Sequence, residues 1–244
     1  MIEDNITTNV QLENGSPAFA KPVLCAGADF GGLISLYNED CLQALKRYDD
    51  NHFDIAIVDP PYGIGEGLKS RGMGTSAMAG NYTVKEWDSS IPNKKYFDEL
   101  FRVSKNQIIW GANYMTKQIP SSMGWIFWDK ESSGDFSDGE LAYTSFNRAL
   151  RKVKIVWMGM RQYDMKNKEV RIHPTQKPIK LYEWLLMNYA KEGDKILDTH
   201  LGSGSIAIAC HNLKFDLTAC ELDKDYFDAS LKRLAQHQAQ TVLF

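Results

Sequence analysis

The chain has 244 residues, of which 43% are hydrophobic and 24% charged, a composition typical of a soluble globular protein with one sizeable core. Its first five residues carry acids instead of the basic start of a secretion signal, no apolar run approaches the ~20 residues of a membrane span, and the four cysteines form no C-x-x-C pair. These features exclude secreted disulfide-rich proteins and membrane proteins, and we expect a cytoplasmic protein with reduced thiols.

The net charge is −3, but basic residues are concentrated in the middle of the chain. Residues 61–180 hold 19 Lys and Arg against 12 Asp and Glu, a balance of +7, and the rest of the chain carries −10. A basic region on an acidic protein indicates either a phosphate-binding surface or an ordinary solvated face, and charge alone favours neither. The candidate phosphate-binding side chains are Arg148, Arg151, Lys152, Lys154, Arg161, Lys166, Lys168 and Arg171.

The hydrophobic pattern predicts strands that alternate with helices, which is typical of a parallel, doubly wound sheet in one α/β domain over residues 31–244. Residues 1–30 lack such a pattern and predict a loose N-terminal arm. The glycine-rich residues 63–86 predict a mobile loop, either a lid over a substrate or a surface loop with no role. We expect strands at 33–37, 54–58, 107–110, 125–128, 153–157, 195–198 and 217–221, helices at 41–48, 96–103, 178–192, 206–213 and from 223 onward, and either a strand or a helix at 140–146.

The sequence Asp59-Pro60-Pro61-Tyr62 directly follows the apolar strand predicted at 54–58. Prolines have fixed φ angles and no N–H group, and a residue before proline is held extended, so these residues predict a stiff elbow. Open α/β sheets bind ligands at the carboxyl ends of their strands. A planar base could stack on Tyr62 while its exocyclic amine donates to Asp59 and to a prolyl carbonyl. The alternative is a Pro-Pro turn with an ordinary surface Asp and Tyr.

A second candidate site lies at residues 198–205, where a predicted strand, a glycine turn and a helix follow one another. Glycines let the backbone approach a ligand, and a helix N-terminus offers free N–H groups. The spacing L-G-S-G-S matches neither the dinucleotide nor the nucleoside-triphosphate pattern, and a tight turn without a ligand is the alternative. Glu221 can accept from ribose hydroxyls and Asp40 from an adenine amine. With Asp198, these carboxylates suit an adenosine-bearing ligand that has a carboxylate and an amine of its own.

Together these segments resemble the S-adenosylmethionine-dependent amino-methyltransferases of DNA in their β-type motif order. The resemblance covers about residues 33–235 and implies a Rossmann-like, doubly wound, mostly parallel seven-stranded sheet with one antiparallel edge hairpin and a permuted motif order. It implies methyl transfer from S-adenosylmethionine to N6 of adenine in double-stranded DNA, after the target base has been flipped out of the duplex. The matching segments are Asn38-Glu39-Asp40-Cys41, Asp59-Pro60-Pro61-Tyr62, His173-Pro174-Thr175-Gln176-Lys177-Pro178, the residues 198–205 and Glu221-Leu222-Asp223.

The resemblance also implies roles for individual residues. Asp59, Pro60, Pro61 and Tyr62 are implied as catalytic. No metal is expected, since His173 has no second His or Cys at ligand spacing. The residues implied to bind the cofactor are Asp40, His173, Thr175, Lys177, Asp198, Thr199, Leu201, Gly202, Ser203, Gly204, Ser205, Glu221, Leu222 and Asp223, and the basic side chains named above are the candidates for DNA binding.

Two departures from the family pattern leave alternatives open. Thr199-His200 stands where the family has Pro-Phe, and the expected target-recognition region, about 157–172, is short. Specificity is then loose, or the loop 63–86 contributes to it, or a second subunit of a homodimer does. The alternatives for function are an N4-cytosine DNA methyltransferase and an inactive DNA-binding protein on the same scaffold. Methylation of a protein glutamine is disfavoured, because those enzymes resemble this chain less at Asp59, where they have Asn.

Overall fold

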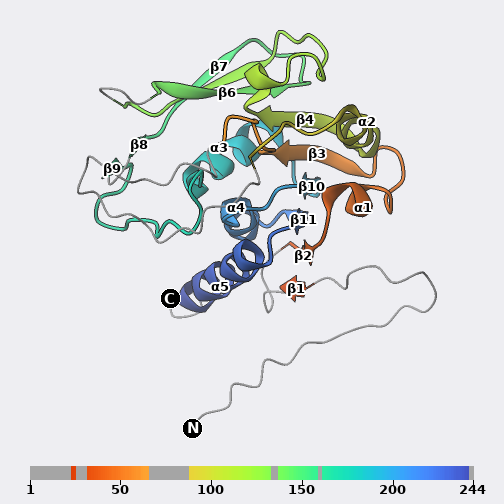
Figure 1. Ribbon diagram of the computed structural model, residues 1–244. Helices are drawn as coiled ribbons and strands as arrows, with labels where there is room; N and C mark the ends of the chain where they lie inside the picture. Colours follow the sequence, from red (N-terminus) through yellow and green to blue (C-terminus); the bar gives the residue numbers. More distant parts are fainter. Residues whose placement is uncertain (1–22, 26–31, 66–87, 133–136, 159–160, 242–244) are drawn as a thin grey trace, which may run out of the picture.

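The computed structural model describes residues 23–25, 32–65, 88–132, 137–158 and 161–241 (Figure 1). Most of the loop predicted at 63–86, and most of the predicted N-terminal arm, lie outside these ranges. The strands are β1 (Val23–Cys25), β2 (Ile34–Asn38), β3 (Phe53–Val58), β4 (Ser104–Trp110), β5 (Trp125–Asp129), β6 (Gly139–Thr144), β7 (Arg151–Lys154), β8 (Trp157–Met158), β9 (Arg161–Gln162), β10 (Lys195–Asp198) and β11 (Asp216–Glu221). The helices are α1 (Cys41–Leu45), α2 (Lys94–Val103), α3 (Ile179–Tyr189), α4 (Ser205–Leu213) and α5 (Lys224–Thr241), with a 3₁₀ turn η2 (Ala112–Tyr114).

The main sheet has the strand order β1-β2-β11-β10-β3-β4-β6-β5-β7. Its five central strands, from β2 to β4, are all parallel, and β6 runs antiparallel to both of its neighbours. The predicted mostly parallel α/β class is therefore confirmed. The predicted number of seven strands differs from the nine in the main sheet of the described part of the chain, since β1 was not predicted and the ambiguous segment 140–146 supplies β6. The antiparallel pair β5–β6 consequently lies one strand inside the edge, because β7 pairs with β5 in parallel.

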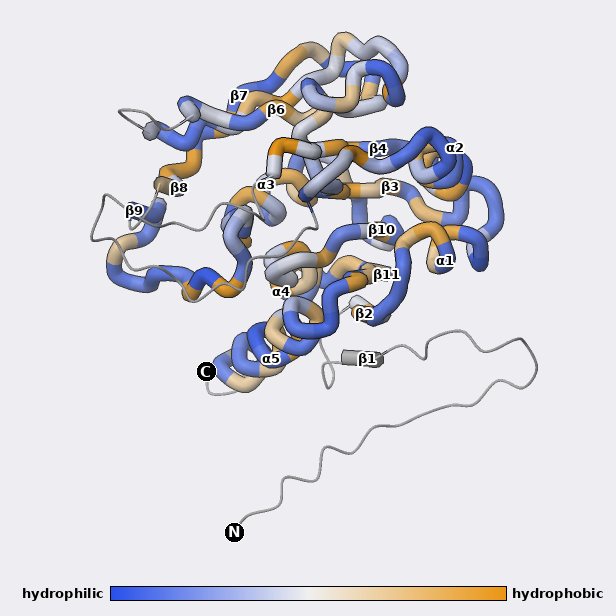
Figure 2. The backbone as a smooth tube through the Cα atoms, in the orientation of Figure 1, coloured by the Kyte–Doolittle hydropathy of each residue, from blue (hydrophilic) through white to orange (hydrophobic). Residues whose placement is uncertain are grey.

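Helices cover both faces of the sheet, as Figure 1 shows: α1 and α2 lie on one side of the strands and α3, α4 and α5 on the other. Alternation along β3 explains the two cores, since Ile55 and Ile57 pack toward α3–α5 while Ala56 and Val58 pack toward α1 and α2. Hydrophilic and hydrophobic residues alternate along α5 in Figure 2, as expected of a helix with one buried side. In the described ranges, the helices are too short or too polar to cross a bilayer.

Several elements differ locally from the predicted ones. Of the residues 140–146, ambiguous in sequence, 140–144 belong to β6, and the predicted strand 153–157 is divided between β7 and β8. β8 and β9 form a small hairpin inside the predicted recognition region 157–172. Val23–Cys25, inside the predicted loose arm, pairs antiparallel with β2. Three residues carry too little periodicity for the sequence to reveal such an edge strand.

The parallel strands β2, β11, β10 and β3 all end at the same edge of the sheet. Asp59 follows β3, Thr199 follows β10, and Glu221 is the last residue of β11. The fold therefore brings the predicted elbow and the predicted glycine turn next to each other, although about 140 residues of chain separate them.

Candidate active site

The elbow at residues 59–62 is held by a buried carboxylate from outside the motif. Oδ1 of Asp88, a residue only 2% exposed, accepts from the backbone N–H groups of Tyr62 at 2.6 Å and Gly63 at 2.9 Å. The prolines fix the chain before these N–H groups and Asp88 fixes it after the turn, so the elbow is restrained on both sides.

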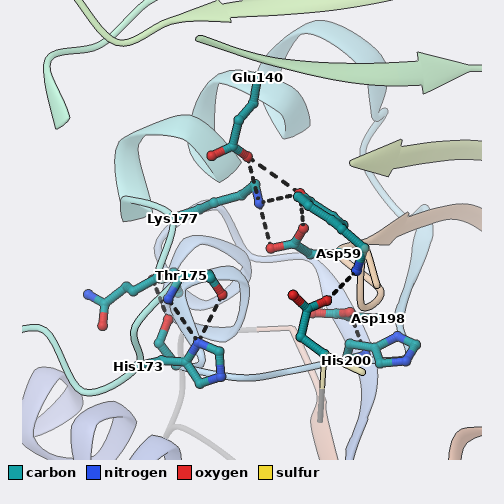
Figure 3. Close-up of polar contacts among 12 residues, drawn as sticks. Asp59, Glu140, His173, Thr175, Lys177, Asp198 and His200 are labelled. Carbon is teal, nitrogen blue, oxygen red and sulfur yellow. Dashed lines mark hydrogen bonds and ion pairs between the residues drawn. The ribbon is translucent and has the colours of Figure 1, made fainter. Parts of the chain in front are cut away.

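Both carboxylate oxygens of Asp59 already have partners, as Figure 3 shows. The Tyr62 hydroxyl donates to Oδ1 at 2.7 Å, and the Lys177 ammonium donates to Oδ2 at 2.5 Å. Burial raises the pKa of Asp59 above its ordinary value, although the positive charge of Lys177 acts to lower it. Lys177 was predicted to bind the cofactor, but its ammonium group lies on Asp59, the carboxylate that was predicted to be catalytic.

Glu140, on β6, completes this cluster and was not predicted from the sequence. Its carboxylate contacts the Lys177 ammonium at 3.0 Å and also forms an ion pair with Lys130. Burial disfavours the charged form of Glu140, but the two ammonium groups outweigh burial and lower its pKa to about 2. Burial likewise acts against the charge of Lys177, yet Asp59 and Glu140 together raise the pKa of Lys177.

The Tyr62 ring contacts the backbone at Gly111 and stacks near the ring of Tyr114. A methyl group on Gly111 would overlap the Tyr62 ring, so this close approach requires glycine, and Gly111 also has a positive φ of 63°. The Tyr114 ring stacks near Tyr62, with ring centroids 5.3 Å apart and an interplanar angle of 16°. Tyr114 itself is 48% exposed, so the exposed aromatic ring at this point is that of Tyr114, whereas the sequence predicted that a base stacks on Tyr62.

The glycine turn after β10 is fixed by the carboxylate at the end of the neighbouring strand. Glu221 accepts from the N–H of Gly202 at 2.8 Å with one oxygen and from the N–H of Asp223 at 2.9 Å with the other. Gly202 and Gly204 have positive φ values of 52° and 71°, which favour glycine at both positions. Burial raises the pKa of Glu221, although the two N–H groups act to lower it.

The departure at Thr199-His200 is accommodated by hydrogen bonds. Oγ1 of Thr199 lies 2.7 Å from the hydroxyl of Tyr96 and 2.9 Å from Nδ1 of His200. Burial lowers the pKa of His200 to about 4, so this ring is neutral at physiological pH. A chain of hydrogen bonds that starts at Tyr96 on α2 thus supports the turn. Tyr96 was not predicted to take part in the site, because the sequence indicated only that it belongs to an amphipathic helix.

One cavity of about 690 Å³ joins the elbow and the glycine turn. Of the residues predicted to bind the cofactor, those that line it are Asp40, His173, Thr175, Lys177, Thr199, Leu201, Gly202, Ser203, Glu221, Leu222 and Asp223. Of those predicted to be catalytic, Asp59 and Pro61 line it, whereas Pro60 and Tyr62 do not. The sequence did not single out several other lining residues, which include Ser90, Asn93, Tyr96, Tyr182 and Tyr226.

Three residues predicted to bind the cofactor lie behind the turn instead of lining the cavity. The buried Asp198 accepts from the N–H of His200 at 2.9 Å. The hydroxyl of Ser205 accepts from Arg233 at 2.8 Å, and a methyl group on Gly204 would be 3.0 Å from Cβ of Ser230. These residues shape the turn from inside the core, and the sequence motif alone does not separate such support from ligand contact.

At the edges of the cavity, two predicted cofactor residues have structural partners. Asp40 caps α1 by accepting from the Gln43 N–H at 3.1 Å. The His173 ring lies 4.3 Å, centroid to centroid, from the Tyr226 ring, and its Nδ1 is 3.2 Å from Oγ1 of Thr175. The side chains of Asp40 and His173 are therefore both held in place by neighbouring residues.

The eight predicted DNA-binding residues do not line the cavity, and three of them lie on the edge strand β7. Arg151 is exposed on the edge strand β7, where Lys152 pairs with Asp129 at 2.7 Å and Lys154 pairs with Glu131 at 3.0 Å. The remaining members are Arg148 beside the Phe146 and Tyr189 rings, Arg161 on β9, the exposed Lys166 and Lys168, and Arg171 with its guanidinium 4.4 Å from the Trp157 ring centroid.

Comparisons with known structures identify the fold. The chain is similar to the PvuII cytosine-N4-specific DNA methyltransferase, with a TM-score of 0.54, 11% identity and coverage of 86% of this chain and 93% of that chain. It is also similar to M1.HpyAVI in complex with SAM, with a TM-score of 0.51, 20% identity and coverage of 82% and 100%. The architecture is therefore that of DNA methyltransferase structures.

Sequence comparisons find similarity to DNA methyltransferases. The N6/N4 model, described as DNA methylase, matches residues 128–232. The type II methyltransferase M.HpaI of Haemophilus parainfluenzae is 25% identical over 80% of this chain and 72% of its own length, and M2.LlaDCHI of Lactococcus lactis subsp. cremoris is 25% identical over 71% of this chain. The chain spans only 55% of M2.LlaDCHI. Residues 128–232 of the chain thus match the N6/N4 DNA methylase family, and the relatives that the chain resembles are type II DNA methyltransferases.

Proposed function

We propose that this protein transfers a methyl group from S-adenosylmethionine to N6 of adenine in DNA. The observation that carries the proposal is the cavity of about 690 Å³, which the Asp59 elbow and the glycine turn line together. A donor bound at the turn and an amine bound at Asp59 would share one enclosed space, and methyl transfer needs that proximity.

The residues of the cavity fit the proposed cofactor. S-adenosylmethionine supplies a methyl group on a positively charged sulfur. The turn before α4 offers backbone N–H groups, Glu221 has lone pairs beyond those that accept from the turn, and Asp40 lies on the cavity wall. These acceptors suit ribose hydroxyls and an adenine amine, and the similar M1.HpyAVI structure is described as a SAM complex.

Asp59 is proposed to accept a hydrogen of the target amine, with the carbonyl of Pro60 as a second acceptor. The target base would be flipped out of the duplex and stacked on Tyr62. A charge-assisted bond from the amine to Asp59 strengthens as positive charge develops on the nitrogen. The Lys177 ammonium at 2.5 Å favours the ionised form of Asp59 that this role requires.

Methylation of N4 of cytosine is the second candidate, because the similar PvuII enzyme is described as cytosine-N4-specific. Both amines are conjugated, and an aromatic ring stacks on either base. We favour adenine because an Asp stands first in the elbow, whereas cytosine-N4 enzymes more often resemble a Ser-Pro-Pro-Tyr sequence.

The test is to incubate the protein with labelled cofactor and mixed-sequence duplex DNA, digest the DNA to nucleosides and separate them by mass spectrometry. We expect label in N6-methyladenine. Label in N4-methylcytosine alone would show that cytosine and not adenine is the target base, and it would leave the cofactor assignment in place. No label, together with no cofactor binding by calorimetry with or without DNA, would favour an inactive DNA-binding protein on this scaffold.

A further inference from the structure

Glu140 lies among the groups of the Asp59 elbow but belongs to a different part of the sheet. It is carried by β6, the strand that runs antiparallel to its neighbours, and it comes 81 positions after Asp59 in the chain. The Lys177 ammonium lies between the two carboxylates, at 2.5 Å from Asp59 and 3.0 Å from Glu140 (Figure 3). Three separate segments therefore meet at one ammonium group.

The charges of this cluster are balanced and protected from solvent. The Lys177 side chain is 2% exposed, against 17% for Asp59 and 23% for Glu140. Lys130 pairs with Glu140 on its outer side, so two ammonium groups face two carboxylates. Taking one member away would leave a buried charge without its counterion, so the members hold one another in place.

The ammonium of Lys177 has little freedom, although lysine is a flexible side chain. It lies 5.3 Å from the Trp110 ring centroid and 5.6 Å from the Tyr62 ring centroid, and it is also 3.1 Å from the Tyr62 hydroxyl. With Asp59 alone as its anion, the ammonium could take several positions around that carboxylate. Glu140 restricts the ammonium to a position where it contacts both carboxylates.

We propose that Glu140 is a positioning residue for Asp59, which it holds through Lys177 in one orientation for the target amine. This inference rests on the proposed function. Glu140 stays ionised throughout the working pH range, so it acts as a fixed anion and not as a proton acceptor. The antiparallel strand β6 thereby takes part in the chemistry at the carboxyl end of the parallel strand β3.

The role of Glu140 can be tested by measuring the pKa of Asp59. Burial and the negative charge of Glu140 raise the pKa of Asp59, while Lys177 and the Tyr62 hydroxyl lower it. Replacing Glu140 by Gln removes one raising influence, so the pKa of Asp59 should fall. The charged and titratable groups that face Asp59 from the surrounding elements are Tyr62, Glu140, Lys177, Tyr182 on α3 and Asp198 on β10.

The experiment compares wild type with Glu140→Gln, using methyl transfer to DNA as a function of pH and cofactor binding by calorimetry. We expect kcat to fall about tenfold or more, since small misplacements of a reacting group cause losses of that size. The acid limb of the kcat profile should move to lower pH while cofactor affinity stays unchanged. An unchanged kcat would overturn the inference, and so would an equal loss of kcat and cofactor affinity with no movement of the acid limb.

A readout that does not depend on activity separates this inference from the proposed function. The carboxyl ¹³C resonance of Asp59 is titrated in both proteins, and we expect a lower midpoint in Glu140→Gln. If wild type methylates no DNA, the proposed function fails while this titration still tests the role of Glu140; an unmoved midpoint would refute that role.

Two further variants keep the test decisive. Glu99→Gln removes a carboxylate that pairs with Arg102 on α2, and it should change neither kcat nor the Asp59 titration. Should Glu140→Gln fail to fold, Lys130→Met loosens Glu140 from its outer side. We expect it to lower kcat by about threefold, a smaller loss than that of Glu140→Gln, and an unchanged kcat would overturn the inference.

Discussion

Asp198, the last residue of β10, is a carboxyl group held inside the core. It is 1% exposed, and burial raises its pKa to about 8, even though the His200 N–H favours the ionised form. The folded protein therefore keeps this proton over a pH range in which the unfolded chain has lost it. The stability that Asp198 contributes is fully present below the ordinary carboxyl pKa and is lost as pH rises through the folded pKa of about 8.

Asp198→Asn imitates the protonated form and should remove this dependence. We expect its free energy of unfolding, relative to wild type, to rise between about pH 5 and about pH 8. Urea unfolding at several pH values measures it, with Asp228→Asn on the exposed side of α5 as the control. A difference between Asp198→Asn and wild type that stays constant with pH would contradict the buried, protonated state.

Glu221 is expected to contribute to cofactor binding both directly and through the glycine turn. Glu221→Ala removes an acceptor for ribose hydroxyls and leaves the N–H groups of Gly202 and Asp223 without their partner. We predict that affinity for S-adenosylmethionine weakens by ~1–3 kcal/mol, the cost of unpaired hydrogen-bonding groups. Calorimetry on the variant measures this, and an unaltered dissociation constant would remove Glu221 from the cofactor site.

At the scale of elements, the end of β4 sets the position of Tyr62. Gly111 has a positive φ and touches the Tyr62 ring, so Gly111→Ala combines backbone strain of ~1–2 kcal/mol with displacement of that ring. Gly193 has a φ of 84°, and a methyl group added there would meet nothing within 4 Å, so it offers a matched control that carries the strain alone.

We therefore predict that Gly111→Ala and Gly193→Ala lose similar stability from strain, but that only Gly111→Ala loses methyl transfer. Thermal unfolding and initial rates on duplex DNA provide the comparison. Equal activity in the two variants would show that Tyr62 does not need its position against Gly111.

The edge strand β7 is the element proposed to contact the DNA backbone. Replacing Arg151, Lys152 and Lys154 with Ala should weaken binding to all DNA sequences. It should also reduce the slope of log K against log salt concentration by up to about 3. Two of the three are paired with Asp129 and Glu131, so the reduction reaches that limit only if DNA displaces those acids. Binding is measured by fluorescence anisotropy at several salt concentrations.

The control for β7 is a triple variant at lysines that are also ion-paired but lie elsewhere. Lys94, Lys105 and Lys224 contact carboxylates at 2.6–2.7 Å, on α2, β4 and α5 respectively. Their replacement by Ala should leave the salt dependence unchanged. Equal effects of the two triple variants would place β7 on an ordinary solvated face.

The sequence predicted those parts of the site that are local in the chain. The Asp59 elbow and the turn before α4 are short strand–turn segments whose residues follow one another, so pattern and turn chemistry identify them. Glu140 could not be found in this way, because its contact with Lys177 depends on the pairing of β4 with β6 across the sheet. Lys177 was assigned to the cofactor because its sequence motif does not reveal that its side chain points toward Asp59 and Glu140.

At the scale of the whole molecule, the order of strands in the sheet assembles the site. β3 lies next to β10, and β10 lies next to β11, so Asp59, the glycine turn and Glu221 meet at one edge. Helices on both faces keep these strands in register. The N-terminal β3 supplies the proposed acceptor side, and the C-terminal β10 and β11 supply the proposed cofactor side; the permuted motif order stays a prediction.

This arrangement predicts that the two halves of the site can be separated by mutation. Asp59→Ala should abolish methyl transfer while binding of S-adenosylmethionine stays nearly intact, because Glu221 and the glycine turn are untouched. Asp59→Asn keeps the shape of the side chain and serves as the companion variant, since Asp59→Ala leaves the buried Lys177 without one of its two carboxylates.

The most direct measurement is therefore paired: transfer of a labelled methyl group to duplex DNA and calorimetric binding of S-adenosylmethionine, each on wild type, Asp59→Ala and Asp59→Asn. We predict transfer by wild type alone, with similar cofactor affinity in all three proteins. Near wild-type turnover by either variant would contradict the assignment of Asp59 as the group that receives the target amine.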